Sequence, residues 1–390
     1  MYKFDERIDR SVVPTLKVHP SVIGIDSDDF FAAGVADMDF PAPQPVIEAM
    51  KIRLEHKVFG YETISSGLLS SLIYWLKNRY NWIVKTDEIL RSPNILNALS
   101  MAVNLFSSEG EGIIIQPPVF FDFYDILREN NRKLVSNPLI LKNGRYYIDF
   151  DDLEIKVRDP YTRMLFLCNP HNPVGRIWQP DELRQIGDLC AQHDVLIISD
   201  EIHADITYNK KRYTPFASLG EGYANNSISC VSPAKSFNIA SCCSAFTIIK
   251  DQLKREVFQA ENSRLTVNKN NAFANVAMEA AYTKGEFWLD AVIHYLEGNI
   301  ALIKSNLKLI EGIELIEPEG TFLLWFDCRT LKMKSKDLKK FFREKARWIV
   351  SSGESFGHEG AGFVRVNIAC PKSVLEEALE RLRKVITFEI

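Results

Sequence analysis

Short apolar segments recur along the middle of the chain and alternate with stretches of helical periodicity. The apolar segments are 113–115, 164–167, 195–198 and 228–231, and their length predicts buried strands. They follow one another at intervals of about thirty residues or more, which leaves room for the crossover helix that parallel strands require. The pattern therefore predicts an α/β domain with a mainly parallel sheet flanked by helices.

The C-terminal third of the chain has a different pattern. Apolar positions repeat at helical spacing in 286–310 and 372–386, whereas 321–326 and 362–367 are predicted as strands. This mixture predicts a smaller α+β domain. The N-terminal residues lack a clear period and are assigned to it as well. The predicted division is a large domain of residues 45–285 and a small domain of residues 1–44 and 286–390.

Composition and charge exclude several classes of protein. The chain has 390 residues, of which 46% are hydrophobic, and 47 Lys and Arg against 51 Asp and Glu give a net charge of −4. These values exclude a disordered chain and give no basic surplus for binding nucleic acid. No apolar stretch approaches the roughly 18 residues that span a membrane. Seven cysteines without a CxxC pair, and no apolar leader, predict a cytoplasmic protein with reduced thiols.

Polar residues follow three of the predicted strands, at the edge where doubly wound sheets bind ligands. Asn172 follows the second strand, Asp200 and His203 follow the third, and Lys235 follows the fourth. Each has a structural alternative. Asn172 could belong to a turn and Asp200 to a helix cap. His203 could be a packed histidine and Lys235 a solvated lysine.

Taken together, these residues favour a cofactor with an aldehyde, a basic ring nitrogen and a phosphate, which is pyridoxal phosphate. A buried lysine amine is readily deprotonated and can condense with the aldehyde. A carboxylate keeps the pyridine nitrogen protonated, so that the ring accepts electrons. An Asn and a His can hydrogen-bond the ring oxygen. Hydroxyls and the N–H groups of a helix N-terminus can hold the phosphate.

Six segments spread over nearly the whole chain carry a further signal. They are Val35–Phe40, Phe59–Tyr61, Cys168–Gly175, Ser199–Asp205, Lys235–Ala240 and Gly362–Ala369. In this order they resemble the fold-type I pyridoxal phosphate enzymes of the class I/II aminotransferase superfamily. The ADMDF and SDEIH segments are most similar to the MalY/PatB cystathionine β-lyase group, which cleaves cysteine S-conjugates.

The resemblance implies roles around the cofactor ring. Lys235 would be the Schiff-base lysine and the proton shuttle, and Asp200 would pair with the pyridine nitrogen. Asn172 and His203 would face the ring oxygen. Phe120 matches the aromatic residue that stacks on the ring.

The resemblance also implies residues for the phosphate and the substrate. Ser232 and the backbone N–H groups of Ile95 and Leu96 would bind the phosphate. Tyr61 matches a tyrosine that reaches the phosphate from the neighbouring subunit, which implies a homodimer with active sites at its interface. Arg365 matches the arginine that binds the substrate carboxylate bidentately, and the resemblance assigns Asn172 to substrate binding as well.

Five positions depart from the pattern of this group. Gly34 stands where a Trp is usual, and Phe120 replaces a Tyr. Asn94 and Ala234 stand where a Gly and a Ser are usual, so the phosphate site is expected to lose a donor. Cys243 stands where many aminotransferases carry an arginine on the phosphate. These changes bear on substrate choice more than on cofactor binding.

The sequence thus predicts a pyridoxal phosphate-dependent carbon–sulfur β-lyase that acts on cystathionine or another cysteine S-conjugate. An aminotransferase is the alternative, because both reactions need the same lysine, acid and arginine. A third possibility is a binding or regulatory protein that keeps the cofactor as a structural ligand. No metal is expected, because the cysteines and histidines lack the spacing of a four-ligand site.

Overall fold

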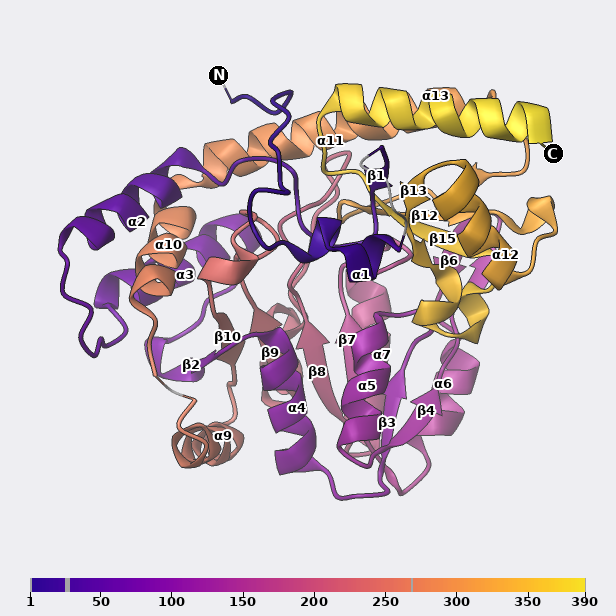
Figure 1. Cartoon of the computed structure of the whole chain (residues 1–390). Helices are drawn as coiled ribbons and strands as arrows, with labels where there is room; N and C mark the ends of the chain where they lie inside the picture. The colour runs from indigo at the N-terminus through magenta and orange to yellow at the C-terminus, as the bar shows by residue number, and fades with distance from the viewer. Residues whose placement is uncertain (1, 25–28, 268, 390) are drawn as a thin grey trace.

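A seven-stranded sheet forms the centre of the computed structural model, which describes residues 2–24, 29–267 and 269–389 (Figure 1). In spatial order its strands are β2 (Ile89–Ser92), β10 (Ala245–Ile248), β9 (Ser227–Val231), β8 (Leu196–Asp200), β7 (Thr162–Cys168), β3 (Gly112–Ile115) and β4 (Lys133–Ser136). β10 is antiparallel to both of its neighbours, and the other pairs are parallel. The four predicted strands are β3, β7, β8 and β9, which lie side by side. The prediction of a mainly parallel sheet is confirmed.

Both faces of this sheet are covered by helices, as a parallel sheet requires. Ile113 and Ile115 of β3 pack into one apolar cluster, whereas Ile114 between them packs into another. The first cluster includes side chains of α4 (Ile95–Phe106), α5 (Phe121–Glu129) and α9 (Gln252–Arg264). The second includes side chains of α6 (Phe150–Val157), α7 (Pro180–Gln192) and, at its edge, α8 (Glu221–Asn225).

The C-terminal third forms an antiparallel sheet with helices beside it. In spatial order the strands are β11 (Glu314–Leu315), β12 (Leu323–Asp327), β15 (Phe363–Asn367) and β14 (Ser351–Ser352). The helices of this part are α11 (Glu286–Leu307), α12 (Ser335–Lys340) and α13 (Lys372–Glu389). The strand predicted at 321–326 begins two residues later, because Thr321 has a φ of 67° and belongs to a turn.

The N-terminal segment packs against this C-terminal part. β1 (Phe31–Ala32) pairs in parallel with β13 (Trp348–Ile349), and the short helix α1 (Pro20–Ile23) precedes it. This pairing agrees with the assignment of the N-terminal residues to the small domain, but the domain boundaries themselves stay a prediction.

Three more helices lie together at the left of Figure 1, namely α2 (Gln44–Glu55), α3 (Ser66–Tyr80) and α10 (Ala272–Lys284). A hairpin of β5 (Ile140–Lys142) and β6 (Arg145–Tyr147) completes the strands of the described residues. None of the helices described is both long and apolar enough to cross a membrane. All seven cysteines are free, in agreement with the predicted reduced thiols, and most of them are buried.

Candidate active site

A cavity of about 260 Å³ lies at the carboxyl ends of β7, β8 and β9. The structure brings together there all but two of the predicted site residues. Those that line the cavity are Ile95, Leu96, Phe120, Asn172, Asp200, His203, Ser232 and Lys235. Parallel neighbouring strands end at one edge of the sheet, so residues separated by tens of positions in sequence meet in one place.

Lys235 lies in the turn that follows β9, and its amine points at backbone rather than at solvent. Its Nζ donates a hydrogen bond of 2.6 Å to the carbonyl oxygen of Ala36. Burial, followed by the nearby charge of Arg365, lowers the pKa of Lys235, although the carboxylates of Asp37 and Asp200 oppose this. The amine is therefore easier to deprotonate than a surface lysine, as a nucleophile or base requires.

Asp200 ends β8 and is almost completely buried. Its Oδ1 accepts a hydrogen bond of 3.1 Å from the N–H of Ile202. Burial raises the pKa of Asp200 to about 6, against the lowering effects of that hydrogen bond and of the Lys235 charge. No cation among the described residues forms an ion pair with it. A buried carboxylate in this state favours a cationic ligand group beside it.

His203 lines the same cavity and has an unused hydrogen-bonding atom. Its Nδ1 is buried and has no partner within the described part of the chain. Burial, followed by the charges of Lys235 and Arg365, holds the pKa of His203 well below its usual value. The ring is therefore neutral at neutral pH and can accept or donate one hydrogen bond to a ligand.

Arg365 lies behind Asn172, on β15, rather than among the residues that line the cavity. Its Nη1 donates to Oδ1 of Asn172 at 3.1 Å, and its Nη2 donates to the carbonyl oxygen of Gly34 at 2.8 Å. The guanidinium lies 4.8 Å from the ring centre of Phe356. Burial lowers the pKa of Arg365 to about 9, and the Asp122 charge opposes this. It stays charged at neutral pH, and its buried Nε has no partner among the described residues.

The N-terminus of α4 opens into the cavity. Asn94 caps the helix, because its side chain accepts a hydrogen bond of 2.9 Å from the N–H of Asn97. The N–H groups of Ile95 and Leu96 belong to the first turn, where a helix offers them no internal partner. Asn94 adopts an extended conformation with φ of −158°, so this position does not require glycine. The helix N-terminus is a suitable site for a phosphate.

Ser232 and its neighbours differ from the expectation of a simple phosphate ligand. The hydroxyl of Ser232 donates to the carbonyl oxygen of Ser244 at 2.9 Å and accepts from the N–H of Ala234 at 3.3 Å. It is also 3.7 Å from the sulfur of Cys243. The hydroxyl proton is therefore already engaged within the chain, and its predicted role toward a phosphate stays a prediction.

Two features of the cavity were missed by sequence reasoning. The backbone of residues 34–39, called the 34–39 segment below, presents carbonyl groups to Lys235 and Arg365. Ala36 of this segment lines the cavity. Asp122 also lines it, although its place in the first turn of α5 suggests only a charge at a helix N-terminus. No basic side chain in the described residues forms an ion pair with Asp122.

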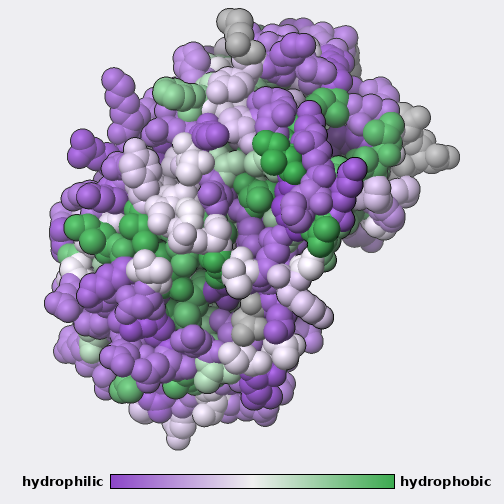
Figure 2. Space-filling model, turned by 90° about the vertical axis from the view of Figure 1, so that its left-hand side faces the viewer, coloured by the Kyte–Doolittle hydropathy of each residue, from purple (hydrophilic) through white to green (hydrophobic). Residues whose placement is uncertain are grey.

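Tyr61 is the second predicted residue that does not line the cavity. It lies in the connection between α2 and α3 and is fully exposed. Large apolar side chains of the same region are exposed as well: Ile52, Leu54, Val58 and Phe59. Figure 2 shows apolar side chains gathered on this side of the molecule. Within one chain, Tyr61 therefore has no part in the site.

Comparison with known proteins gives consistent results over nearly the full length. The family model described as aminotransferase class I and II matches residues 31–382. Cystathionine beta-lyase PatB of Bacillus subtilis (strain 168) is 38% identical over 98% of this chain and 100% of that protein. Protein MalY of Escherichia coli (strain K12) is 31% identical over 92% of each. The crystal structure of cystalysin from Treponema denticola, which contains pyridoxal 5'-phosphate, has a TM-score of 0.96 and 34% identity over 99% of both chains.

Proposed function

Because the chain belongs to the class I and II aminotransferase family, and within it to the group of PatB and MalY, we propose that it is a pyridoxal phosphate-dependent carbon–sulfur β-lyase. Its substrate is cystathionine or another cysteine S-conjugate, and its products are a thiol, pyruvate and ammonia. The observation that carries the proposal is the placement of Lys235, Asp200 and Asn172 around one cavity, with Arg365 hydrogen-bonded to Asn172.

The donor and acceptor groups of the cavity fit pyridoxal phosphate. Within the described ranges the carboxylate of Asp200 has no cationic partner, and a protonated ring nitrogen would provide one. The unpartnered Nδ1 of His203 and the amide of Asn172 suit the ring oxygen. The N–H groups of Ile95 and Leu96 suit the phosphate. When bound, the cofactor supplies a carbonyl that condenses with amino groups and a ring that withdraws electrons.

The residues of the chain provide the remaining chemistry. Arg365 binds the α-carboxylate of the substrate, and Asn172 holds the guanidinium in place through its 3.1 Å hydrogen bond. Lys235 takes the α-proton at Nζ, because burial lowers the pKa of its amine. Asp200 would hold the bound cofactor through its ring nitrogen and would favour the protonated form of that nitrogen. The thiol leaves from the β-carbon, and the three-carbon remainder is hydrolysed to pyruvate and ammonia.

A second copy of the chain would complete the site. The resemblance assigns Tyr61 to the phosphate of the neighbouring subunit, and its full exposure beside other exposed apolar side chains supports this assignment. Several exposed large apolar side chains in one region of the chain are typical of a protein interface. We infer a homodimer in which each cavity receives Tyr61 from the partner. The free cysteines support a cytoplasmic location.

Release of pyruvate tests the proposal. Purified protein loaded with pyridoxal phosphate should release pyruvate from L-cystathionine without any keto acid. An aminotransferase would instead need a keto acid and would stop after one turnover without it. A loaded protein that is inert toward every thioether amino acid would favour the regulatory alternative. Asp200→Ala is the matched control, since it should retain the fold but lose turnover.

A further inference from the structure

The 34–39 segment connects the two basic residues of the active site through its backbone. The carbonyl of Gly34 accepts from Arg365 at 2.8 Å, and the carbonyl of Ala36 accepts from Lys235 at 2.6 Å. The position of this backbone therefore contributes to where the amine and the guanidinium point, and the guanidinium is held in addition by Asn172 and Ser351. Whatever holds the segment acts on both groups at once.

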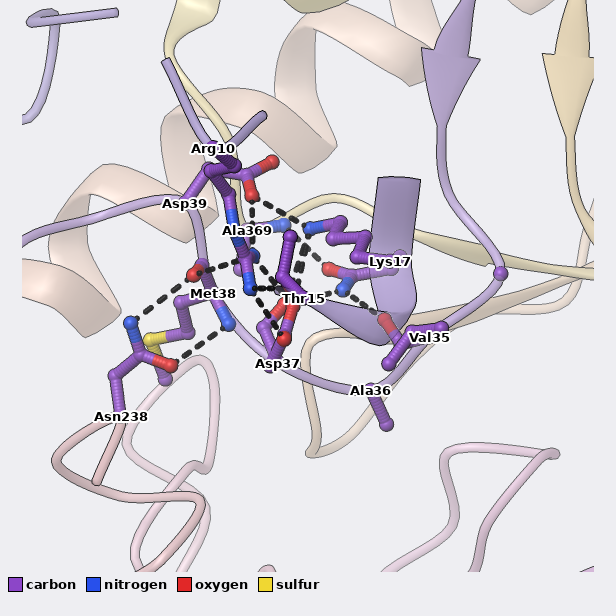
Figure 3. Close-up of polar contacts among 12 residues, drawn as sticks. Arg10, Thr15, Lys17, Val35, Ala36, Asp37, Met38, Asp39, Asn238 and Ala369 are labelled. Carbon is purple, nitrogen blue, oxygen red and sulfur yellow. Dashed lines mark hydrogen bonds and ion pairs between the residues drawn. The ribbon is translucent and has the colours of Figure 1, made fainter. Parts of the chain in front are cut away.

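On its other side the segment is held by an ion cluster with the N-terminal residues (Figure 3). Arg10 forms a two-pronged contact with the carboxylate of Asp37, at 2.8 and 2.7 Å, and its Nη1 also lies 2.9 Å from Oδ1 of Asp39. Lys17 donates to the carboxylate of Asp39 at 2.8 Å and to the backbone carbonyl of Asp37 at 3.2 Å. Two cations from the N-terminal segment thus face two carboxylates of the 34–39 segment.

The cluster is shielded from water, which strengthens its interactions. The side chain of Lys17 is 2% exposed, whereas that of Arg10 is 21% exposed. The hydrogen bond to Asp37 raises the pKa of Arg10. Burial opposes ionisation of Asp37, but Arg10 and Lys17 together hold the pKa of its carboxyl below the usual value. Removing Arg10 would leave Lys17 to compensate both carboxylates, at 2.8 Å from Asp39 and 3.4 Å from Asp37, which is unfavourable for two partly buried acids.

Asn238 and Asn367 hold the same segment through its backbone. Asn238 exchanges hydrogen bonds with Met38 at 3.0 Å in both directions, and Asn367 donates to the carbonyls of Val35 and Asp37 at 2.6 Å each. These contacts do not involve the carboxylates. Without Arg10 and Lys17, the carboxylates of Asp37 and Asp39 would repel each other. This repulsion would move the 34–39 segment, and with it the carbonyls that contact Lys235 and Arg365, although the asparagines still hold its backbone.

We propose that Arg10 and Lys17 are positioning residues of the active site, which act through Asp37 and Asp39 to fix the carbonyls that orient Arg365 and Lys235. This inference rests on the proposed function for its kinetic consequences. Neither Arg10 nor Lys17 lines the cavity, so neither touches the reacting atoms.

The charge of Asp37 gives the proposal a spectroscopic consequence. Burial and then the Arg365 charge lower the pKa of Lys235, whereas the charge of Asp37 raises it. Arg10 compensates that charge. The charged and titratable groups that act on or near Lys235 are Arg365, Asp37, Asp200, Cys243, Asp122 and His203. Loss of Arg10 should therefore make the nitrogen of Lys235 retain its proton to higher pH.

The test compares Arg10→Met with a matched control from the same N-terminal segment. Arg7 forms an exposed ion pair of 2.5 Å with Glu377 on α13 and makes no contact with the 34–39 segment among those described. Two quantities are measured on loaded protein. The first is the pH midpoint of the visible absorption band, which reports protonation at the nitrogen joining Lys235 to the cofactor. The second is kcat/KM for pyruvate release from L-cystathionine.

Arg10→Met should raise the midpoint by roughly half a pH unit and lower kcat/KM about 10- to 100-fold, while Arg7→Met changes neither. Arg10→Lys keeps the positive charge but loses the two-pronged contact of the guanidinium with the Asp37 carboxylate. Compared with Arg10→Met, it should therefore restore the pH midpoint more fully than kcat/KM. The proposal is overturned if Arg10→Met changes neither the pH midpoint nor kcat/KM, or if Arg10→Met and Arg7→Met change them equally.

A second variant keeps the test decisive if Arg10→Met does not fold. Asp37→Asn removes the charge itself, so it should lower the midpoint, and an unchanged midpoint overturns the proposal. The midpoint needs no substrate. If the wild-type protein releases no pyruvate, the proposed function fails, while the midpoints of the variants still decide whether Arg10 and Asp37 act on Lys235.

Discussion

Replacing Asp200 by asparagine should stabilise the cofactor-free protein while abolishing its catalysis. Burial raises the pKa of this carboxyl from 3.8 to about 6. Each unit of pKa is worth about 1.4 kcal/mol, so ionised Asp200 destabilises the empty folded chain by about 3 kcal/mol. Asparagine carries no charge, and its Oδ1 can keep the hydrogen bond that Asp200 accepts from Ile202.

The pH dependence gives the prediction its sign. Below pH 3.8 the carboxyl is protonated in both the folded and the unfolded chain. Between pH 3.8 and about 6 the unfolded chain ionises first, so the folded state of the wild type loses stability as the pH rises. Asp200→Asn avoids this loss. The free energy of unfolding of Asp200→Asn should exceed that of the wild type by about 1–3 kcal/mol at pH 7.5, and by roughly half of that at pH 5.

Urea unfolding of cofactor-free protein at both pH values, at one protein concentration, measures this difference. Added pyridoxal phosphate should stabilise the wild type more than Asp200→Asn, because only the carboxylate can pair with a cationic ring nitrogen. The reasoning is refuted if the variant is no more stable than the wild type at pH 7.5, or if its advantage does not depend on pH.

Three further predictions concern the substrate and the partner subunit. Arg365→Lys should raise KM for L-cystathionine about 10- to 100-fold, because lysine cannot replace the bidentate fork; an unchanged KM in steady-state assays would contradict its role. Asp122→Asn should lower kcat/KM about fivefold more for L-cystathionine, whose leaving group carries a second ammonium, than for S-methyl-L-cysteine. Equal losses for the two substrates would argue against a contact with that ammonium. Tyr61→Ala and Lys235→Ala should each be inactive, but mixed and refolded together they should recover about a quarter of wild-type activity, because half of the dimers contain one complete site. No recovery on mixing would exclude a Tyr61 shared between subunits.

The sequence by itself determined the core of the large sheet and the residues at its functional edge. Apolar runs such as 164–167 mark strands because both faces of a parallel sheet are buried, and this property is visible in a few consecutive residues. Parallel strands end at one edge, so the positions that follow them predicted that Asn172, Asp200 and Lys235 would meet. The structure brings these three residues to one cavity.

The sequence was less informative where the pattern is ambiguous. β10 was not predicted, and its antiparallel direction cannot be read from Ala245–Ile248, because a short buried strand looks the same in either orientation. Asp122 was missed because an acid in the first turn of a helix already has a local explanation. Its presence in the cavity depends on how α5 packs.

Only the tertiary structure decided how the N-terminal residues contact the segment beside the active site. Arg10 meets Asp37 across 27 positions, and Gly34 meets Arg365 across 331. Neither contact has a periodicity or a motif spacing, since backbone carbonyls are identical in every residue and ion pairs between distant segments leave no local pattern. Strands and helices can be recognised from neighbouring residues, because their periodicity is local. The orientation of Lys235 and Arg365 depends instead on the backbone of the 34–39 segment, which is far from both residues in the sequence.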